Sequence, residues 1–323
     1  MPRLGAVAGA VGLLAIVSLF VGVGDVTPAG LWDAVVGGSE RDDALLVLAS
    51  RLPRTIAIVL AGAGLAIAGQ IMQLLSRNRF VEPSTAGTVE SAALGILAVT
   101  VLAPGAPVMV KMLAATLAAL AGTALFLRIL HHVPLRSPLV VPLVGLMLGG
   151  VVNAVSTFFA YRLDLLQSLN VWMTGDFSGV LRGRYELLWL TFALVLLAYL
   201  VADRFTLAGM GQDFVTTLGM SYRSVMALGL AIVAMVTAVV VVTVGAIPFL
   251  GLVVPNLVAM IFGDNLRRTA PLVALGGAAF VLVCDLVGRT VRYPYEVPIG
   301  VVVGVVGSAL FLTLLLRRGA RVA

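Results

Sequence analysis

The sequence predicts an all-α polytopic membrane protein with about ten transmembrane helices, a broken helix near residues 245–256 and both termini in the cytoplasm. The first observation is composition: 61% of the 323 residues are hydrophobic and 11% are charged, whereas a soluble domain carries roughly 25% charged residues. The second is that apolar runs of about 20 residues, the length that crosses a bilayer, recur along nearly the whole chain. The third is the distribution of arginine, which sets the orientation.

Ten apolar stretches are expected to form the spans, and this even number places both termini on one side of the membrane. The first follows Arg3 and is too long for the core of a signal peptide. The eighth is too short to cross a bilayer alone. In chain order, the predicted spans are 4–24, 54–75, 88–103, 107–130, 138–160, 186–202, 224–244, 252–262, 271–291 and 299–316.

The positive charges favour cytoplasmic termini. With the N-terminus inside, twelve of the 21 Lys and Arg residues fall in inside segments and nine in outside ones, as the positive-inside rule expects. Residues 1–323 are predicted to form one transmembrane domain, with an external surface segment at 25–53 and a cytoplasmic segment at 208–223. The basic residues are scattered over loops, which argues against nucleic acid as a partner and fits lipid headgroups.

Residues 245–256 (GAIPFLGLVVPN) are the most informative stretch, because they are apolar yet include two glycines and two prolines. A proline inside a helix removes a backbone donor and clashes with the preceding turn, so the helix is expected to break here. In hydrocarbon, a break is tolerated only where protein or a water-filled cavity surrounds the freed backbone groups. A broken apolar element therefore indicates a transport pathway.

The chain is not expected to be an enzyme, and no catalytic residue is predicted. A P-loop needs a lysine beside the phosphates, and the single lysine, Lys111, lies at the start of an apolar span. No cofactor is expected on this chain. If ATP drives transport, ATP and Mg²⁺ belong to a partner chain.

Glu90 and Asp285 are the main carboxylates within the predicted spans. Two isolated acidic groups make a poor proton relay, and Asp285 lies one helical turn from Arg289, so a local ion pair is the simpler interpretation. A role beyond structure stays open for both. No metal site is expected, because His131 and His132 are adjacent and point apart on a helix and the chain has a single cysteine.

The cytoplasmic segment 208–223 is predicted to dock into a partner. Residues 212–218 have the length of two helical turns, and Gly211 and Gly219 flank them as helix breakers. A second helix is expected to open at Ser221. This short helix, glycine turn and second helix suit a cleft on a cytoplasmic partner, and a plain connecting loop is the alternative.

Polar residues on the fifth span are predicted to mark the pathway. Asn153, Ser156 and Thr157 have the spacing i, i+3 and i+4 of one helical face. Polar groups avoid lipid, so this face is expected to line a cavity or to form hydrogen bonds with another helix. Gly145 and Gly149 have a small-xxx-small spacing, for which ordinary packing inside the bundle is the preferred interpretation.

Several motifs, in order along the chain, resemble the permease subunits of type II ABC importers for iron siderophores, haem and cobalamin. They are residues 51–54 (RLPR) with the Gly-rich span that follows, the turn at 77–87, the glycine at 219, the stretch 245–256 and residues 296–302 (EVPIGVV). The resemblance covers the chain from about residue 45 to the end. The variants at 78–88, 172–178 and 293–296 most resemble the branch that handles catecholate-type ferric siderophores. Asn256 departs from the pattern, since many relatives have histidine there.

The resemblance implies half of a transporter in the inner membrane of a bacterium. Two permeases of ten helices each would form a central pathway, two cytoplasmic ATPases would drive it, and an external binding protein would deliver the ligand. The second permease would be an identical copy or, as we expect, a related chain.

The same resemblance assigns roles to three sets of residues. Docking of the binding protein is implied for Arg51, Arg54 and Arg289. Coupling to the ATPase is implied for Gln212, Asp213, Phe214, Leu218, Gly219 and Met220. An inner gate is implied near Asn78, Phe80 and Ser137.

The function expected from all of this is uptake of a ferric siderophore of the catecholate type, and the alternative within the same class is an importer for haem or cobalamin. Two other classes stay as alternatives: an ion- or proton-driven secondary transporter and a membrane scaffold that transports nothing. The scarcity of buried charge argues against the first of these, and the broken helix argues against the second. The sequence does not name the ligand.

Overall fold

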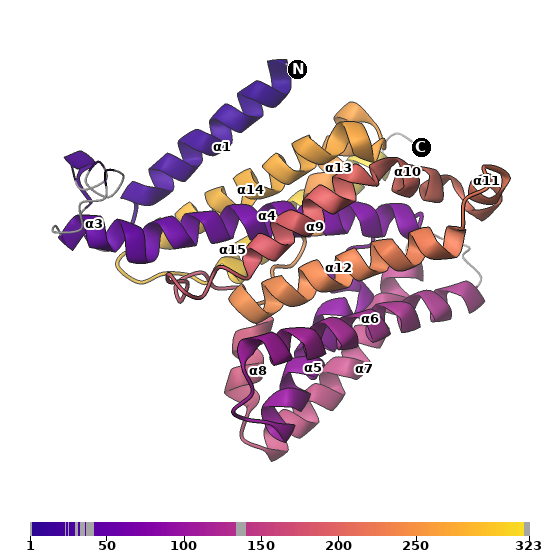
Figure 1. Cartoon of the computed structure of the whole chain (residues 1–323), viewed down its shortest axis with the longest axis horizontal. Helices are drawn as coiled ribbons and strands as arrows, with labels where there is room; N and C mark the ends of the chain where they lie inside the picture. The colour runs from indigo at the N-terminus through magenta and orange to yellow at the C-terminus, as the bar shows by residue number, and fades with distance from the viewer. Residues whose placement is uncertain are drawn as a thin grey trace.

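The computed structural model describes residues 2–22, 24, 26–29, 32, 36, 42–133 and 140–319, and these residues form helices and connecting turns without a β-strand. The helices lie side by side in one bundle, with α4 (Leu52–Leu75) through its middle (Figure 1). This helix packs most extensively against α9 (Leu188–Leu200), α12 (Tyr222–Val244), α13 (Leu250–Phe262) and α14 (Leu266–Thr290). Its small residues allow this close packing, because glycine and alanine let helix backbones approach.

Each predicted span overlaps a helix of the structure. The remaining helices that do so are α1 (Pro2–Phe20), α5 (Thr88–Leu102), α6 (Val108–His132), α7 (Val140–Arg162) and α15 (Ile299–Gly319). Shorter elements complete the described chain: α3 (Asp42–Leu46), η1 (Val47–Arg51), η2 (Pro83–Ala86), α8 (Leu166–Met173), α10 (Ala202–Met210) and α11 (Gln212–Thr217).

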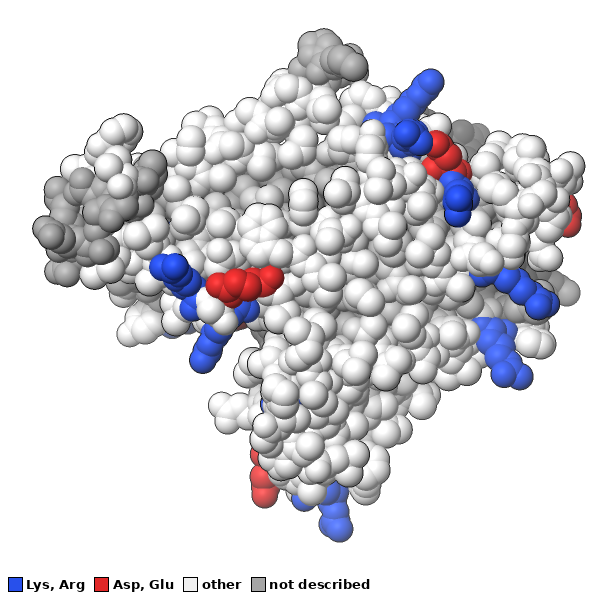
Figure 2. Space-filling view, in the orientation of Figure 1, with Lys and Arg blue, Asp and Glu red and all other residues white. Residues whose placement is uncertain are grey.

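Five helical stretches of the described chain are long and apolar enough to cross a membrane alone, or six if the pair α9 and α10, bent by 62°, counts as one. The all-helical class and several membrane-spanning helices are therefore confirmed. The number of crossings and the side on which the termini lie stay predictions. In Figure 2, charged side chains gather in groups near the margins of the molecule and leave a broad uncharged surface between them, as a lipid-facing surface requires.

The helix that contains α4 begins earlier than the sequence predicted. Ala44–Leu75 form one continuous stretch of 32 residues, whereas 45–53 were assigned to the external surface segment. Pro53 has no N–H to donate to the carbonyl of Ala49, four residues earlier. The backbone N–H of Arg182 donates to that carbonyl instead, at 3.0 Å. The π-type turn η1 at this point fits a proline near a helix start. Much of the rest of segment 25–53 lies outside the described residues.

The two glycines on α7 pack inside the chain, as the sequence interpretation preferred. A β-carbon on Gly145 would lie 1.9 Å from the carbonyl oxygen of Thr85, and one on Gly149 would lie 3.5 Å from Gly87 Cα. Both contacts are with η2 and the residue that follows it. The small-xxx-small spacing thus lets α7 approach the turn between α4 and α5.

Candidate functional site

An ion network joins α1, α4 and α14 at one end of the bundle. Its hub is Asp285, whose side chain is 1% exposed. Asp285 Oδ1 accepts hydrogen bonds from Arg54 Nε at 3.2 Å and Nη2 at 2.7 Å, and Oδ2 accepts from Arg289 Nη2. Arg54 Nη1 also pairs with Glu296 Oε2 at 2.7 Å. One buried carboxylate is therefore shared by two guanidinium groups, which is the kind of compensation that a buried charge requires.

The arginines of this network also bind the end of α1. Arg289 Nη1 donates to the carbonyls of Ser18 at 3.1 Å and Val21 at 2.8 Å, and Arg51 Nη1 donates to Leu19 O at 2.9 Å. The last carbonyls of a helix have no partner within the helix, and they attract positive charge. The network thus holds α1 against α4 and α14.

The structure brings together the three arginines that the sequence predicted as a docking set, and it confirms the local pair between Asp285 and Arg289. It differs from the expectation of a surface location, because Arg51 and Arg289 are 5% and 4% exposed. Arg54 and Glu296 lie further out, with side chains 12% and 27% exposed. The internal contacts account for the first two arginines, and docking of a partner at this end stays a prediction.

The predicted break near residues 245–256 is present and is confined to its first half. Helix α12 ends at Val244, and α13 begins at Leu250. Gly245 has a φ of 82°, which glycine adopts without strain. Protein groups bind the freed backbone, because the N–H of Asp176 donates to Val244 O at 2.8 Å and the N–H of Ala246 donates to Trp172 O at 3.2 Å.

The second proline of this stretch does not interrupt the helix, which continues through it as the predicted span 252–262 does. Pro255 lies inside α13, where it deprives the carbonyl of Gly251 of its partner. Gln73 Nε2, on α4, donates to that carbonyl at 3.1 Å. Asn256 Nδ2 donates to Arg79 O at 2.7 Å and to Leu252 O at 2.8 Å. Gln73 therefore replaces the lost hydrogen bond and ties α13 to α4, and Asn256 ties α13 to the turn after α4.

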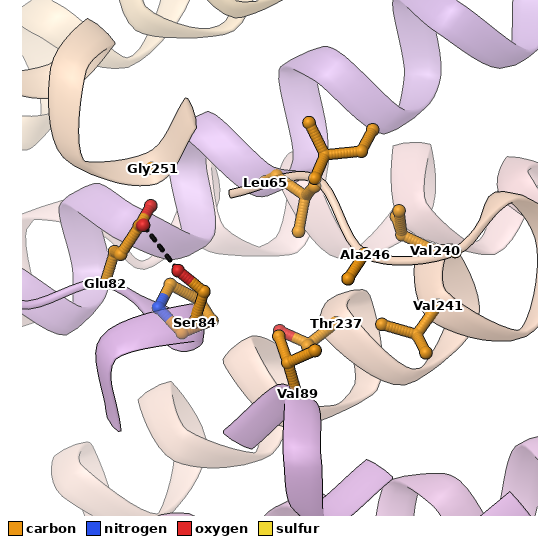
Figure 3. Close-up of a pocket in the computed structure, with 12 residues that line it drawn as sticks. Leu65, Glu82, Ser84, Val89, Thr237, Val240, Val241, Ala246 and Gly251 are labelled. Carbon is orange, nitrogen blue, oxygen red and sulfur yellow. Dashed lines mark hydrogen bonds between the residues drawn. The ribbon is translucent and has the colours of Figure 1, made fainter. Parts of the chain in front are cut away.

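Glu82, in the turn between α4 and α5, holds the start of α13. Its Oε1 accepts a hydrogen bond from Ser84 Oγ at 2.5 Å (Figure 3) and another from the N–H of Phe249 at 2.8 Å. Burial raises the pKa of Glu82 to about 7, although hydrogen bonds from Ser84 and from the N–H groups of Phe249, Leu252 and Gly251 favour the ionised form. A carboxyl group at a helix N-terminus satisfies donors that the helix cannot. Sequence reasoning missed this contact, because no spacing links residues 82 and 249.

The cavity beside Glu82 is too small for a transported ligand. Apolar side chains of Leu65, Val240 and Val241 close it on the sides away from Glu82 (Figure 3). Its volume of about 10 Å³ is close to the space that one water molecule needs. Among the described residues, no group of three His, Cys, Asp or Glu side chains is placed to hold a metal ion.

The polar residues predicted to share a face of α7 divide into two sets. Asn153 and Thr157 are exposed, whereas Ser156 is 1% exposed and donates to Val152 O at 2.9 Å. Ser156 and Thr157 are adjacent and therefore point about 100° apart around the helix, so Ser156 reaches the packed side while Thr157 stays exposed. Only 22% of the apolar window of α7 is buried, the lowest share among the five long spans.

Glu90, on α5, lies against Gly149, and its Oε2 is buried without a hydrogen-bond partner among the described residues.

Segment 208–223 has the predicted short helix between two glycines, followed by a helix that Ser221 caps. Gly211 precedes α11 with a φ of 120°, and Gly219 follows it with a φ of 74°. Phe214 and Leu218 are 45% and 53% exposed on one side of α11, while Val215 is fully buried on the other. Met220 packs against the core, and Gln212 and Asp213 are exposed. In Figure 1, α11 lies at the opposite end of the molecule from α3.

The predicted gate residues are described only in part. Asn78 is 7% exposed, and its Oδ1 accepts a hydrogen bond from the N–H of Phe80 at 2.8 Å. The ring of Phe80 meets that of Phe311 on α15 edge to face, with centroids 5.9 Å apart. Ser137 lies outside the described residues, so an inner gate formed by all three stays a prediction.

Several long apolar helices, one of them interrupted, and a buried ion network at one end of the bundle define a polytopic membrane protein. The chain belongs to the FecCD transport family, which matches residues 10–317. It is therefore a membrane permease, a class of subunit that is not itself an enzyme.

Two relatives and one solved structure show the extent of the similarity. The petrobactin import system permease protein YclN of Bacillus subtilis is 49% identical over 95% of this chain and 96% of its own. The ferric-anguibactin transport system permease protein FatD of Vibrio anguillarum is 46% identical over 84% of this chain and 87% of its own. An inward-facing metal-chelate type ABC transporter has the same fold, with a TM-score of 0.78, 23% identity and coverage of 97% and 98% of the two chains.

Proposed function

We propose that this chain is the permease subunit of an ABC importer that carries a ferric siderophore across the inner membrane of a bacterium. The observation that carries the proposal is the similarity to two siderophore permeases at 49% and 46% identity over most of the chain. The cargo proposed is of the catecholate type, with haem or cobalamin as the alternative. ATP and Mg²⁺ are bound and used by separate ATPase subunits.

Uptake in living cells tests this function. The chain is expressed with its neighbouring permease, ATPase and binding-protein genes in a bacterium that lacks its own siderophore permeases, and radioactive iron is supplied as catecholate, hydroxamate or haem complexes. We expect catecholate uptake, lost when the P-loop lysine of the ATPase is replaced, and co-purification of the ATPase with the permease. Uptake that survives loss of the ATPase would contradict an ATP-driven importer and favour a secondary transporter.

A second permease is proposed to cover the exposed face of α7. This face carries large apolar side chains, among them Leu146, Met147 and Phe158, which are 58%, 66% and 60% exposed. It also carries the exposed polar residues Asn153 and Thr157. A helix face that exposes both large apolar and polar side chains fits two permeases that pack together and enclose a pathway.

Cysteine labelling can locate that pathway. We expect cysteines at 153 and 157 to react with an aqueous thiol reagent in at least one nucleotide state of the assembled complex, because a water-filled pathway admits the reagent. A cysteine at 156 is the matched control, since Ser156 is buried, and it should stay protected. If 153 and 157 are protected in every state, α7 packs against protein or lipid and the pathway lies elsewhere. The native Cys284 is buried and serves as the background.

The exposed side of α11 is proposed to contact the ATPase. Replacing Leu218 with aspartate is expected to weaken co-purification of the ATPase. The substitution removes the apolar side chain that would be buried against the ATPase. Replacing Gly219 with valine is expected to leave assembly and basal ATPase activity in place while ligand-stimulated activity and uptake fall several-fold. A β-carbon there meets nothing within 4 Å, so the cost comes only from the φ of 74°.

A control variant separates conformation from bulk at this position. Asparagine tolerates the left-handed region better than valine does, so Gly219→Asn should keep most of the uptake. Equal loss in the asparagine and valine variants would show that the turn conformation is not the cause. Normal uptake in both Leu218→Asp and Gly219→Val would mean that another cytoplasmic segment carries the coupling.

The binding protein is proposed to dock at the end of the molecule that holds the ion network. Arg54 and Glu296 are its more exposed members, whereas Arg51 and Arg289 bind the end of α1. A charge reversal at Arg54 would also place a carboxylate beside Asp285 and Glu296. Docking measurements on this variant therefore need a measurement of folding beside them.

A further inference from the structure

A polar cavity lies beside the cytoplasmic segment, where α4 ends. Its volume is about 410 Å³, within the range of roughly 300–1,000 Å³ for small-molecule pockets. Its walls come from the end of α4, from α10, from the end of α13 and from the residues before α14. Polar side chains line much of it, including those of Gln70, Gln73, Arg77, Thr206 and Asn265.

An unpartnered acceptor lies in the wall of this cavity. Gln70 is 4% exposed, and its Nε2 donates to Thr269 Oγ1 at 2.7 Å. The hydroxyl of Thr269 donates its own proton to Asn265 O at 2.8 Å, so it can only accept from Gln70, which fixes the orientation of the amide. Gln70 Oε1 then has no partner among the described residues. A buried carbonyl oxygen without a donor is rare in folded proteins and points to a missing partner.

A positive charge without a partner lies at the same cavity. Arg77 is exposed, and its side chain makes no hydrogen bond or ion pair with the part of the chain that the structure describes. The other arginine in the wall, Arg79, is paired with Asp264. Arg77 is held at this point by a backbone with a φ of 50°, and its Nη1 lies 3.3 Å from where a β-carbon on Gly211 would be.

The two unused groups define the chemistry of a ligand. A guanidinium binds a phosphate or carboxylate, often through two parallel hydrogen bonds, and Gln70 Oε1 needs a donor such as a hydroxyl. Gln70 lies on α4 five residues before its last residue, roughly 7.5 Å along the axis at 1.5 Å per residue, and Arg77 lies two residues beyond that end. A phosphate ester on a short hydroxylated carbon chain spans such a distance and supplies both groups. We propose that the cavity binds a glycerophosphate group, either as free glycerol 3-phosphate or as the headgroup of phosphatidylglycerol.

A ligand in this cavity would act on segment 208–223, for which contact with the ATPase is proposed above. This effect therefore rests on the proposed function. Gly209 and Met210 at the end of α10 line the cavity, and Gly211 then starts α11. A phosphate held by Arg77 would fix the joint between these two helices. Ligand that binds one arrangement of the joint more tightly than another shifts the balance between them.

The test uses the purified full chain without its ATPase, so that its result is independent of the importer proposal. Calorimetry measures glycerol 3-phosphate binding to the chain in detergent. Native mass spectrometry measures how much phosphatidylglycerol the chain retains against phosphatidylcholine. Arg77→Gln and Gln70→Leu are the test variants, and Arg268→Gln is the control, since Arg268 lies on the same side of the molecule but outside the cavity wall.

We expect about tenfold weaker binding in either test variant, the effect of losing one hydrogen bond to a charged or buried group, and unchanged binding in Arg268→Gln. Binding of the soluble ester identifies a site for a metabolite, and selective retention of phosphatidylglycerol alone identifies a lipid site. Arg77→Gln changes an exposed side chain and should fold as wild type, so it keeps the test valid if Gln70→Leu does not fold. Absence of both kinds of binding, or equal loss in Arg268→Gln, would overturn the proposal.

Discussion

Replacing Asp285 with alanine is expected to destabilise the folded protein by about 3–5 kcal/mol, because it leaves the buried guanidinium of Arg289 and the partly buried one of Arg54 without their shared carboxylate. Asp285 is the contact of Arg289 on its own helix and of Arg54 on α4. The change should also loosen α1, since Arg289 Nη1 donates to Val21 O at 2.8 Å. The measurements are the thermal midpoint of the purified chain in detergent and the yield of inserted protein.

Two further variants make this result specific. Asp264→Ala removes the partner of Arg79 in a pair whose side chains are 54% and 39% exposed, and exposed pairs contribute about 0–1 kcal/mol. In the double variant Asp285→Ala, Arg289→Met, one of the stranded charges is gone, so it should be more stable than Asp285→Ala alone. If Asp285→Ala is no worse than Asp264→Ala, the network does not hold this end of the bundle.

The helices of this fold could be predicted from the sequence because their signal is local. A window of about 20 apolar residues is a property of neighbours along the chain, and every predicted span overlaps a helix. The pair of Asp285 with Arg289 and the breaks at Gly211 and Gly219 were predictable for the same reason. Each depends on residues at most four positions apart or on the backbone freedom of one glycine.

The contacts that position the candidate site could not be predicted, because they join residues far apart in the chain. Arg54 is 231 residues from Asp285, and Gln73 is 178 residues from Gly251. The second contact explains how α13 continues through Pro255. A proline breaks a helix when its freed carbonyl has no substitute donor, and the sequence of α13 alone does not show that α4 supplies one.

Replacing Gly69 with alanine is expected to destabilise the protein by about 3 kcal/mol, at the upper end for overpacking a core. A β-carbon there would lie 2.1 Å from the carbonyl oxygen of Gly251 and 2.3 Å from its Cα. Both are backbone atoms, so no side-chain rotation can relieve the clash, and α4 must move away from α13. That movement would also stretch the bond from Gln73 Nε2 to Gly251 O, which replaces the one that Pro255 removes.

Gly150→Ala is the matched control for Gly69→Ala, because it makes the same substitution inside α7 at a glycine with nothing within 4 Å of the new β-carbon. Alanine favours a helix over glycine by about 0.5–1 kcal/mol, so this variant should be as stable as wild type or more so. The two substitutions are thus expected to shift the thermal midpoint of the purified chain in opposite directions. A Gly69→Ala protein that melts with or above wild type would show that α4 and α13 are not in backbone contact, and the support of the broken helix by α4 would have to be abandoned.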